Sequence, residues 1–168
     1  MARGILVGLG SNLPHPRFGP PRAILEAALA QLAARRVAIL DRSRWYESAP
    51  VPASDQPWYV NCVALVDTAL PPAALLASLH EIERAFGRAR RVVNEARPLD
   101  LDLLAYGDLV NPGPAPPILP HPRLAGRAFV LLPLAELLPR WRHPATGESV
   151  ARLIAALPAA QTARPLAS

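Results

Sequence analysis

The sequence predicts an α+β fold in which helices pack on an antiparallel sheet. The 168-residue chain has the length of one ordinary domain, and its 51% hydrophobic content is enough to build a buried core. Its apolar patterns also switch between the two-residue period of strands and the 3.6-residue period of helices. We therefore expect a single domain over residues 1–160 and a frayed tail over 161–168, where apolar periodicity is lost.

The first half of the chain predicts a strand, a helix and a second strand. Residues 4–10 (GILVGLG) form a short apolar run that ends in a Gly-Ser-Asn turn, as a buried strand does. Residues 22–36 carry apolar side chains at helical spacing and predict an amphipathic helix. Residues 37–48 (VAILDRSRWYES) predict the second strand, which a Pro-containing loop separates from the next.

The second half repeats the pattern. Residues 58–70 predict a third strand, and residues 71–87 predict a helix that opens with prolines and stops at Gly87. A basic loop then leads to the strand expected over 99–107. The order is β-α-β-β-α-β, the ferredoxin-like arrangement, with an antiparallel sheet and two helices on one face.

The remainder of the chain adds a stiff loop and two further helical patterns. Prolines keep the loop at 111–123 (NPGPAPPILPHPR) extended. Helices are expected over 127–138 and 149–157.

Composition excludes several classes of chemistry. All 18 Lys-plus-Arg positions are arginine, so a Walker A loop and Schiff-base catalysis, which need lysine, are excluded. Cys62 is the only cysteine, which excludes an internal disulfide and a thiolate zinc site. The chain has no run of 18 apolar residues and no recognisable signal segment, so we expect a cytoplasmic protein without membrane contact.

An acidic pair marks the first candidate site. Asp100 and Asp102 share one face of the strand expected over 99–107, about 7 Å apart, where their charges repel. A solvated edge is one explanation. The other is a metal site, because carboxylates suit Mg²⁺ and five arginines precede the pair, at positions 84, 88, 90, 91 and 97. Such a group of charges fits a nucleoside triphosphate with its metals.

Two further groups of residues are candidates. His121, Arg123 and Arg127 follow the Pro-rich loop and can donate hydrogen bonds to a phosphate chain, although a loop histidine is more often structural. The segment 48–62 offers Gln56, Asn61 and backbone groups beside aromatic rings, which suits a planar heterocycle or an ordinary turn and strand.

Six motifs in order then resemble one family. They are GLGSN (8–12), YESAPV (46–51), DQPWYVN (55–61), IERAFGR (82–88), RPLDLDLLAYG (97–107) and LPHPRLAGRAFVLLPL (119–134). Together they resemble 6-hydroxymethyl-7,8-dihydropterin pyrophosphokinase of folate biosynthesis. The resemblance implies transfer of diphosphate from the co-substrate ATP to the hydroxymethyl group of the pterin, with release of AMP after attack on the β-phosphorus.

The resemblance also implies residue roles. Asp100 and Asp102 would hold two Mg²⁺ ions. The pterin would lie between Tyr59 and Phe129 and bind Asn61 and the backbone of residues 48–51. That last set comprises Ser48, Ala49, Pro50 and Val51. ATP contacts are implied for Glu83, His80, Arg88, Arg90, Arg97, His121 and Arg127. The catalytic residues implied are Arg88, Arg97, Asp100 and Asp102.

Two departures from the family pattern are visible. The loop at 88–97 lacks the family's Trp-Gly pair, and Pro14 and His15 replace Gly-Asp after the first turn. We expect the 88–97 loop to close over both substrates and exclude water.

Two other functions stay open on composition and fold. Palm-like nucleotidyl transferases also carry metal-binding aspartates on strands, but they release pyrophosphate. The sequence pI of 10.6 is compatible with a nucleic-acid-binding module, although the strands lack exposed aromatics for base stacking. We therefore expect a protein that binds small molecules and no nucleic acid. Because no partner surface stands out in the sequence, we also expect a monomer.

Overall fold

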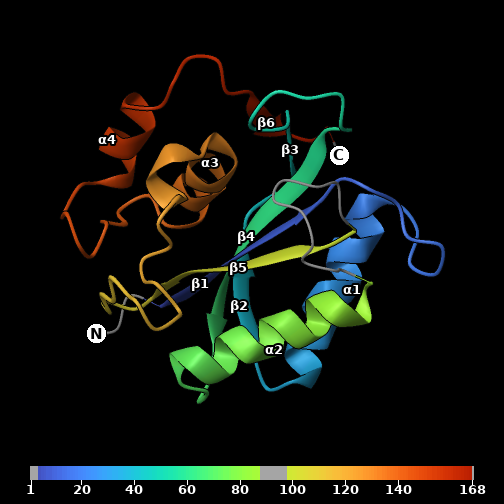
Figure 1. Cartoon of the computed structure of the whole chain (residues 1–168). Helices are drawn as coiled ribbons and strands as arrows, with labels where there is room; N and C mark the ends of the chain where they lie inside the picture. Colours follow the sequence, from blue (N-terminus) through green and yellow to red (C-terminus); the bar gives the residue numbers. More distant parts are fainter. Residues whose placement is uncertain (1–3, 88–97, 168) are drawn as a thin grey trace.

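A computed structural model of the chain describes residues 4–87 and 98–167 (Figure 1). The strands are β1 (Ile5–Ser11), β2 (Ala38–Arg42), β3 (Tyr46–Ser48), β4 (Tyr59–Asp67), β5 (Asp100–Tyr106) and β6 (Ala163–Pro165). The helices are α1 (Pro21–Ala34), α2 (Pro72–Ala85), α3 (Ala128–Leu137), α4 (Val150–Ala155) and the short 3-10 helix η1 (Leu124–Gly126). The α+β fold predicted from the sequence is confirmed.

The sheet is antiparallel at every pairing among the described strands. Its order is β5-β1-β4-β3-β6, and β2 pairs with the far half of β4. β1 pairs with β4 on one side and with β5 on the other. The β-α-β-β-α-β order predicted from the sequence is therefore present, with β1 between β5 and β4.

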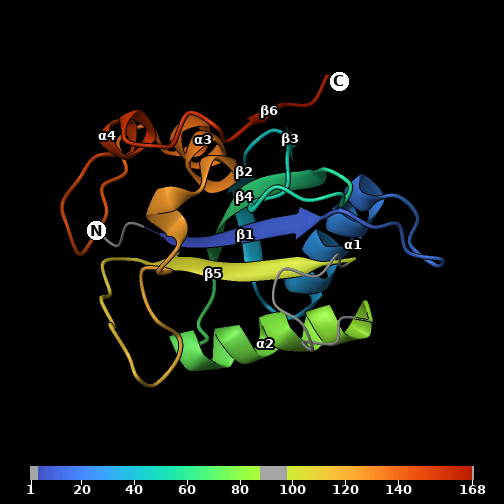
Figure 2. The ribbon, with the colours of Figure 1, turned by 45° about the horizontal axis from the view of Figure 1, so that its top comes forward.

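Helices cover both faces of the sheet (Figure 2). On one face, α1 and α2 pack against the β1 side chains Ile5, Val7 and Leu9. On the other, α3 and α4 pack around Leu6 together with Leu104 and Trp141. Alternate residues of β1 thus enter different cores, as the two-residue period of a strand requires.

The strand expected over 37–48 is divided in two. A register shift lies between Ile39 and Asp41, and β2 ends at Arg42. At Ser43 the hydroxyl, in place of a backbone carbonyl, accepts the Val63 N–H at 3.1 Å, while the Ser43 N–H donates to the Val63 carbonyl at 2.9 Å. The hydroxyl interrupts the regular ladder, and pairing resumes in β3.

The tail expected to be frayed is partly ordered. Ala163–Pro165 form β6, which pairs with β3. The expectation was wrong for these residues because a three-residue strand at the sheet edge is held by backbone hydrogen bonds and needs no apolar alternation. In the part of the chain that the structure describes, no helix is long and apolar enough to cross a membrane.

Candidate active site

Two glycines of β1 form the floor of a pocket on the α3 face of the sheet. Gly10 lies between Asp100 of β5 and Asn61 of β4, and Gly8 lies between Asp102 and Val63. A Cβ on Gly10 would lie 3.0 Å from Nδ2 of Asn61. Because Gly8 and Gly10 carry no side chains, the aspartates of β5 and Asn61 of β4 line the same space above β1.

The acidic pair lines one end of this pocket. Asp100 and Asp102 are half-buried and lie on the pocket face of β5, as the strand period predicts. Arg127, which precedes α3, places its guanidinium 3.9 Å from one carboxylate oxygen of Asp102. Nε2 of His121 lies 3.9 Å from the other. Positive charge from another element therefore offsets the repulsion between the two aspartates.

His121 is a neutral imidazole in this setting. Burial, together with the positive charge of Arg127, lowers its pKa to about 4, while Asp100 opposes the shift. Its Nδ1 accepts the Arg123 N–H at 3.2 Å. The single proton of the neutral ring therefore lies on Nε2, the atom that faces Asp102 and can donate to an anionic oxygen.

A hydrogen bond from a buried serine fixes the orientation of the Asn61 amide. The buried Ser48 donates its hydroxyl hydrogen to Oδ1 of Asn61 at 2.6 Å. This bond fixes the amide so that Nδ2 lies over Gly10 on the pocket side. Tyr59 from β4 and Phe129 from α3 add aromatic surface to the pocket, and the Arg127 guanidinium lies 5.3 Å from the centre of the Phe129 ring.

The loop beside this end is tied to the first strand. Asn12, which is 2% exposed, donates through Nδ2 to Oε1 of Gln56 at 3.1 Å and to the Pro57 carbonyl at 3.2 Å. Gln56 itself lines the pocket. The Gly-Ser-Asn turn therefore positions the pocket wall, a role that the sequence did not indicate.

Most of the described residues that the sequence singled out meet in this pocket. Its lining includes Ala49, Pro50, Val51, Tyr59, Asn61, Asp100, Asp102, Arg127 and Phe129. Ser48 acts from behind Asn61, and His121 stands beside Asp102. Arg88, Arg90 and Arg97, with the 88–97 loop, lie outside the described residues.

Glu83 lies in the core rather than on the pocket wall. It is 1% exposed, and its carboxylate accepts the Leu101 N–H at 2.8 Å. Leu101 separates the two aspartates, so Glu83 ties α2 to the middle of the acidic segment. His80 lies on the same helix, outside the pocket lining.

Sequence reasoning did not assign Gly8, Gly10 or Cys62 to the pocket, although all three line it. Two glycines inside a strand signal a close approach by another group, which could have identified the floor. Cys62 is 1% exposed, and burial raises the pKa of its thiol to about 12. The thiol is therefore protonated and unsuited to nucleophilic attack.

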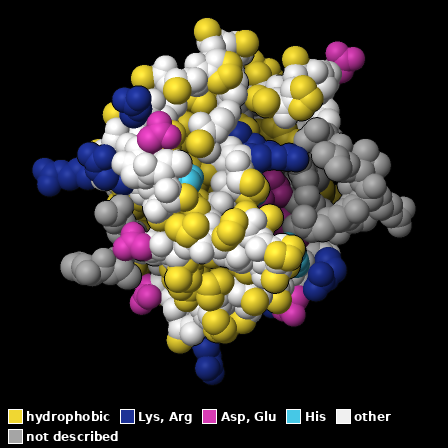
Figure 3. All heavy atoms as spheres, turned by 60° about the vertical axis from the view of Figure 1, so that its left-hand side comes forward, with side chains coloured by type: hydrophobic (Ala, Val, Ile, Leu, Met, Phe, Trp, Pro, Cys, Tyr) yellow, Lys and Arg dark blue, Asp and Glu magenta, His cyan; other side chains and the backbone are white. Residues whose placement is uncertain are grey.

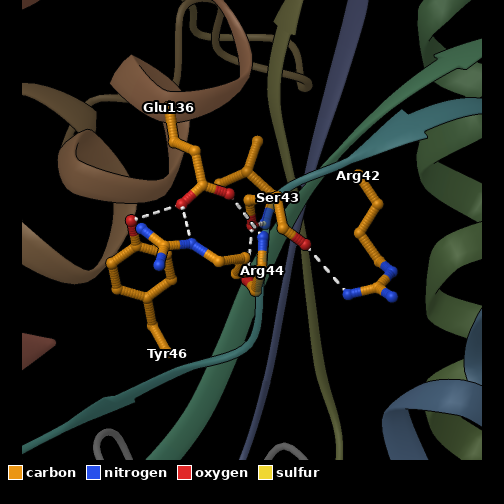
Figure 4. Close-up of polar contacts among 6 residues, drawn as sticks. Arg42, Ser43, Arg44, Tyr46 and Glu136 are labelled. Atoms are coloured by element: carbon orange, nitrogen blue, oxygen red, sulfur yellow. Dashed lines mark hydrogen bonds and ion pairs between the residues drawn. The ribbon is translucent and has the colours of Figure 1, made fainter. Parts of the chain in front are cut away.

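An acidic residue of α3 anchors that helix to the sheet (Figure 4). Glu136 accepts the backbone N–H of Arg44 at 2.6 Å, its Nε–H at 2.7 Å and the Tyr46 hydroxyl at 2.9 Å. Burial favours the protonated carboxyl, but these hydrogen bonds prevail and lower the pKa of Glu136. The anchor fixes the helix that carries Phe129 over the pocket.

Comparison with known proteins identifies the family. The model of the family described as 7,8-dihydro-6-hydroxymethylpterin-pyrophosphokinase (HPPK) matches residues 6–139. The chain belongs to this family. Membership in HPPK confirms the resemblance drawn from the six motifs and the pyrophosphokinase class of enzyme.

Individual relatives agree with this assignment. A 2-amino-4-hydroxy-6-hydroxymethyldihydropteridine pyrophosphokinase of Pseudomonas aeruginosa is 41% identical over 158 residues, which cover 94% of each chain. One of Synechocystis sp. is 40% identical over 152 residues, 90% of this chain and 74% of that protein.

A solved structure shares the fold. The crystal structure of Plasmodium falciparum HPPK-DHPS wild type with SDX-DHP aligns with a TM-score of 0.65 at 13% identity. The alignment covers 89% of this chain and 42% of that one, so the chain spans less than half of the larger protein. At this identity the likeness shows the fold alone.

Proposed function

We propose that this HPPK family member transfers diphosphate from ATP to the hydroxymethyl oxygen of 6-hydroxymethyl-7,8-dihydropterin and releases AMP. The oxygen attacks the β-phosphorus, a new O–P bond forms, and the bond from the β-phosphorus to the oxygen bridging to the α-phosphate breaks. The hydroxyl proton is released to solvent, and AMP leaves with the bridging oxygen. One observation carries the proposal: a single pocket is lined by two carboxylates, by an oriented amide and by two aromatic side chains.

The acidic end fits magnesium. Among residues 4–87 and 98–167, no group of three or more His, Cys, Asp or Glu side chains could hold a metal ion. Mg²⁺ does not need such a group, because it commonly takes one or two carboxylates and completes its shell with water and phosphate oxygens. Asp100 and Asp102 would hold two ions, which when bound neutralise phosphate charge and orient the reacting groups.

The other described pocket residues would neutralise phosphate charge and position the pterin. Arg127 can contact phosphate oxygens bidentately from its place beside Asp102, and Nε2–H of His121 can donate to the same chain. Asn61, with its amide oriented by Ser48, would bind the polar edge of the pterin ring. Tyr59 and Phe129 would stack on its faces. The ATP contacts predicted for Arg88, Arg90 and Arg97 rest on the sequence.

This arrangement requires no covalent nucleophile from the protein. Rate enhancement comes from holding the two substrates together and from stabilising charge that develops on the phosphoryl oxygens. The buried, protonated Cys62 is consistent with this conclusion.

The test is a product assay. The protein is incubated with ATP, Mg²⁺ and 6-hydroxymethyl-7,8-dihydropterin, and the nucleotides and pterins are resolved by chromatography. AMP formed in step with pterin diphosphate supports the proposal. ADP would show γ-phosphoryl transfer, inorganic pyrophosphate would show nucleotidyl transfer, and either would refute it.

A nucleic-acid-binding role finds no support on the described residues of one face of the molecule. On the face drawn in Figure 3, the coloured basic side chains are scattered among hydrophobic ones and form no continuous stripe. Nucleic-acid binding relies on clustered cations along one surface.

A further inference from the structure

The C-terminal segment touches both walls of the pterin pocket. This segment, residues 161–166, includes β6 and lies beyond the stretch matched by the family model. Figures 1 and 2 both show it running past α3 and along β3. α3 carries one pocket wall, and the chain that leaves β3 forms the other.

Gln161 holds the backbone on both sides of Arg127. Its Oε1 accepts the Ala128 N–H at 2.8 Å, and its Nε2 donates to the Gly126 carbonyl at 2.7 Å. Arg127 is the residue between these two groups and the N-cap of α3. The Gln161 side chain therefore fixes the backbone of Arg127, whose guanidinium reaches Asp102. Phe129, which also lines the pocket, follows two residues later.

The residues after Gln161 hold the opposite wall. The Thr162 carbonyl accepts the Ala49 N–H at 3.1 Å, and Ala163 pairs with Ser48 across β6 and β3. Arg164 adds an ion pair with Glu47 at 2.6 Å. Ser48 is the residue that orients Asn61, and Ala49 lines the pocket.

We propose that residues 161–166 are a positioning clamp that sets the two pocket walls for pterin, with Gln161 as its principal residue. This inference rests on the proposed function, because it assigns pterin to the pocket. Gln161 touches neither substrate in this reading. It acts through the backbone of Gly126 and Ala128, which preorganises the site and lowers the ordering cost of binding.

The test compares Gln161→Ala with Gln31→Ala, a matched change at an exposed glutamine of α1. Pterin dissociation constants are measured by fluorescence titration at a temperature where thermal melts show each protein to be folded. Two lost hydrogen bonds predict a rise of about tenfold for Gln161→Ala and none for Gln31→Ala. Gln161→Glu keeps the acceptor for Ala128 but sets a carboxylate oxygen against the Gly126 carbonyl, which repels it, so its dissociation constant should also rise.

A purely structural role gives a different result. It would lower the melting temperature of Gln161→Ala while its pterin affinity stays within twofold of wild type, and this outcome overturns the clamp. If Gln161→Ala does not fold, Arg164→Ala, which removes an exposed side chain, replaces it. An about threefold loss of affinity then supports the clamp, and unchanged affinity overturns it.

The two proposals fail differently. A wild-type protein that binds no pterin refutes the proposed function, and the clamp with it. A wild-type protein that binds pterin and forms its diphosphate, beside a Gln161→Ala variant of equal affinity, refutes the clamp alone.

Discussion

Removal of one hydroxyl behind the pocket should separate binding from turnover. Ser48 is 1% exposed and Asn61 is 4% exposed, and their side chains share a hydrogen bond of 2.6 Å. Ser48→Ala leaves Oδ1 of Asn61 without this donor in a buried place. The amide then loses the contact that fixes which of its two ends faces the pocket.

The size of the effect follows from the burial. A buried acceptor that loses its donor costs about 1–3 kcal/mol, so the free energy of unfolding should fall by that amount. If the amide must be reoriented when pterin binds, each 1.4 kcal/mol that this costs weakens binding about tenfold. We expect the pterin KM of Ser48→Ala to rise about tenfold with kcat nearly unchanged, because the hydroxyl does not face the phosphates.

The assay is steady-state kinetics with pterin varied at saturating ATP and Mg²⁺, accompanied by denaturant unfolding. Ser149→Ala is the matched control, because Ser149 accepts the Arg152 N–H at 3.2 Å as the N-cap of α4, away from the pocket. That variant should lose about 1 kcal/mol of stability and keep its KM. A Ser48→Ala protein with a pterin KM within twofold of wild type would refute the proposed orientation of Asn61.

Three other predictions concern the floor, the acidic pair and the α3 anchor. Gly10→Ala places a Cβ 3.0 Å from Nδ2 of Asn61 and should weaken pterin binding about tenfold in fluorescence titration; unchanged affinity would contradict the role of the floor. Asp100→Asn and Asp102→Asn should abolish AMP formation while circular dichroism shows the native fold, and activity within about threefold of wild type would remove the metal assignment. Glu136→Gln should lower stability at neutral pH, because three hydrogen bonds reach that carboxylate. Since folding lowers the pKa of Glu136, its stabilisation is complete above its ordinary pKa and is lost as pH falls through the folded-state pKa. Chemical denaturation from about pH 6 to pH 3 should therefore show the wild-type advantage shrinking, and a constant difference would contradict it.

The fold was predictable wherever local patterns decide structure. Alternation placed Asp100 and Asp102 on one face and Leu101 in the core, and the structure agrees. The break at Ser43 was not predictable, because a serine hydroxyl that replaces a ladder acceptor leaves the apolar pattern intact. The pairing of β6 was equally hidden, since a short edge strand is held by its backbone.

The candidate site divides in the same way. Residue types whose chemistry is visible in the sequence, such as Asn61 and Arg127, were found and line one pocket. The sequence did not reveal the role of residues that position other residues of the pocket. Asn12 was assigned to a turn yet holds a pocket wall through Gln56. Glu83 was assigned to the nucleotide yet bonds a strand backbone, because long-range partners are not written in local spacing.

The bond from Leu101 to Glu83 also bears on how this protein stays separate from its neighbours. Among the described strands, β5 lies at one end of the sheet order, and a strand in that position can present N–H groups to a strand of another molecule. Glu83 occupies one of these groups, between the two aspartates, and an incoming strand would have to displace a buried carboxylate. The same contact that steadies the acidic segment therefore also blocks one backbone position at which another strand could pair with β5.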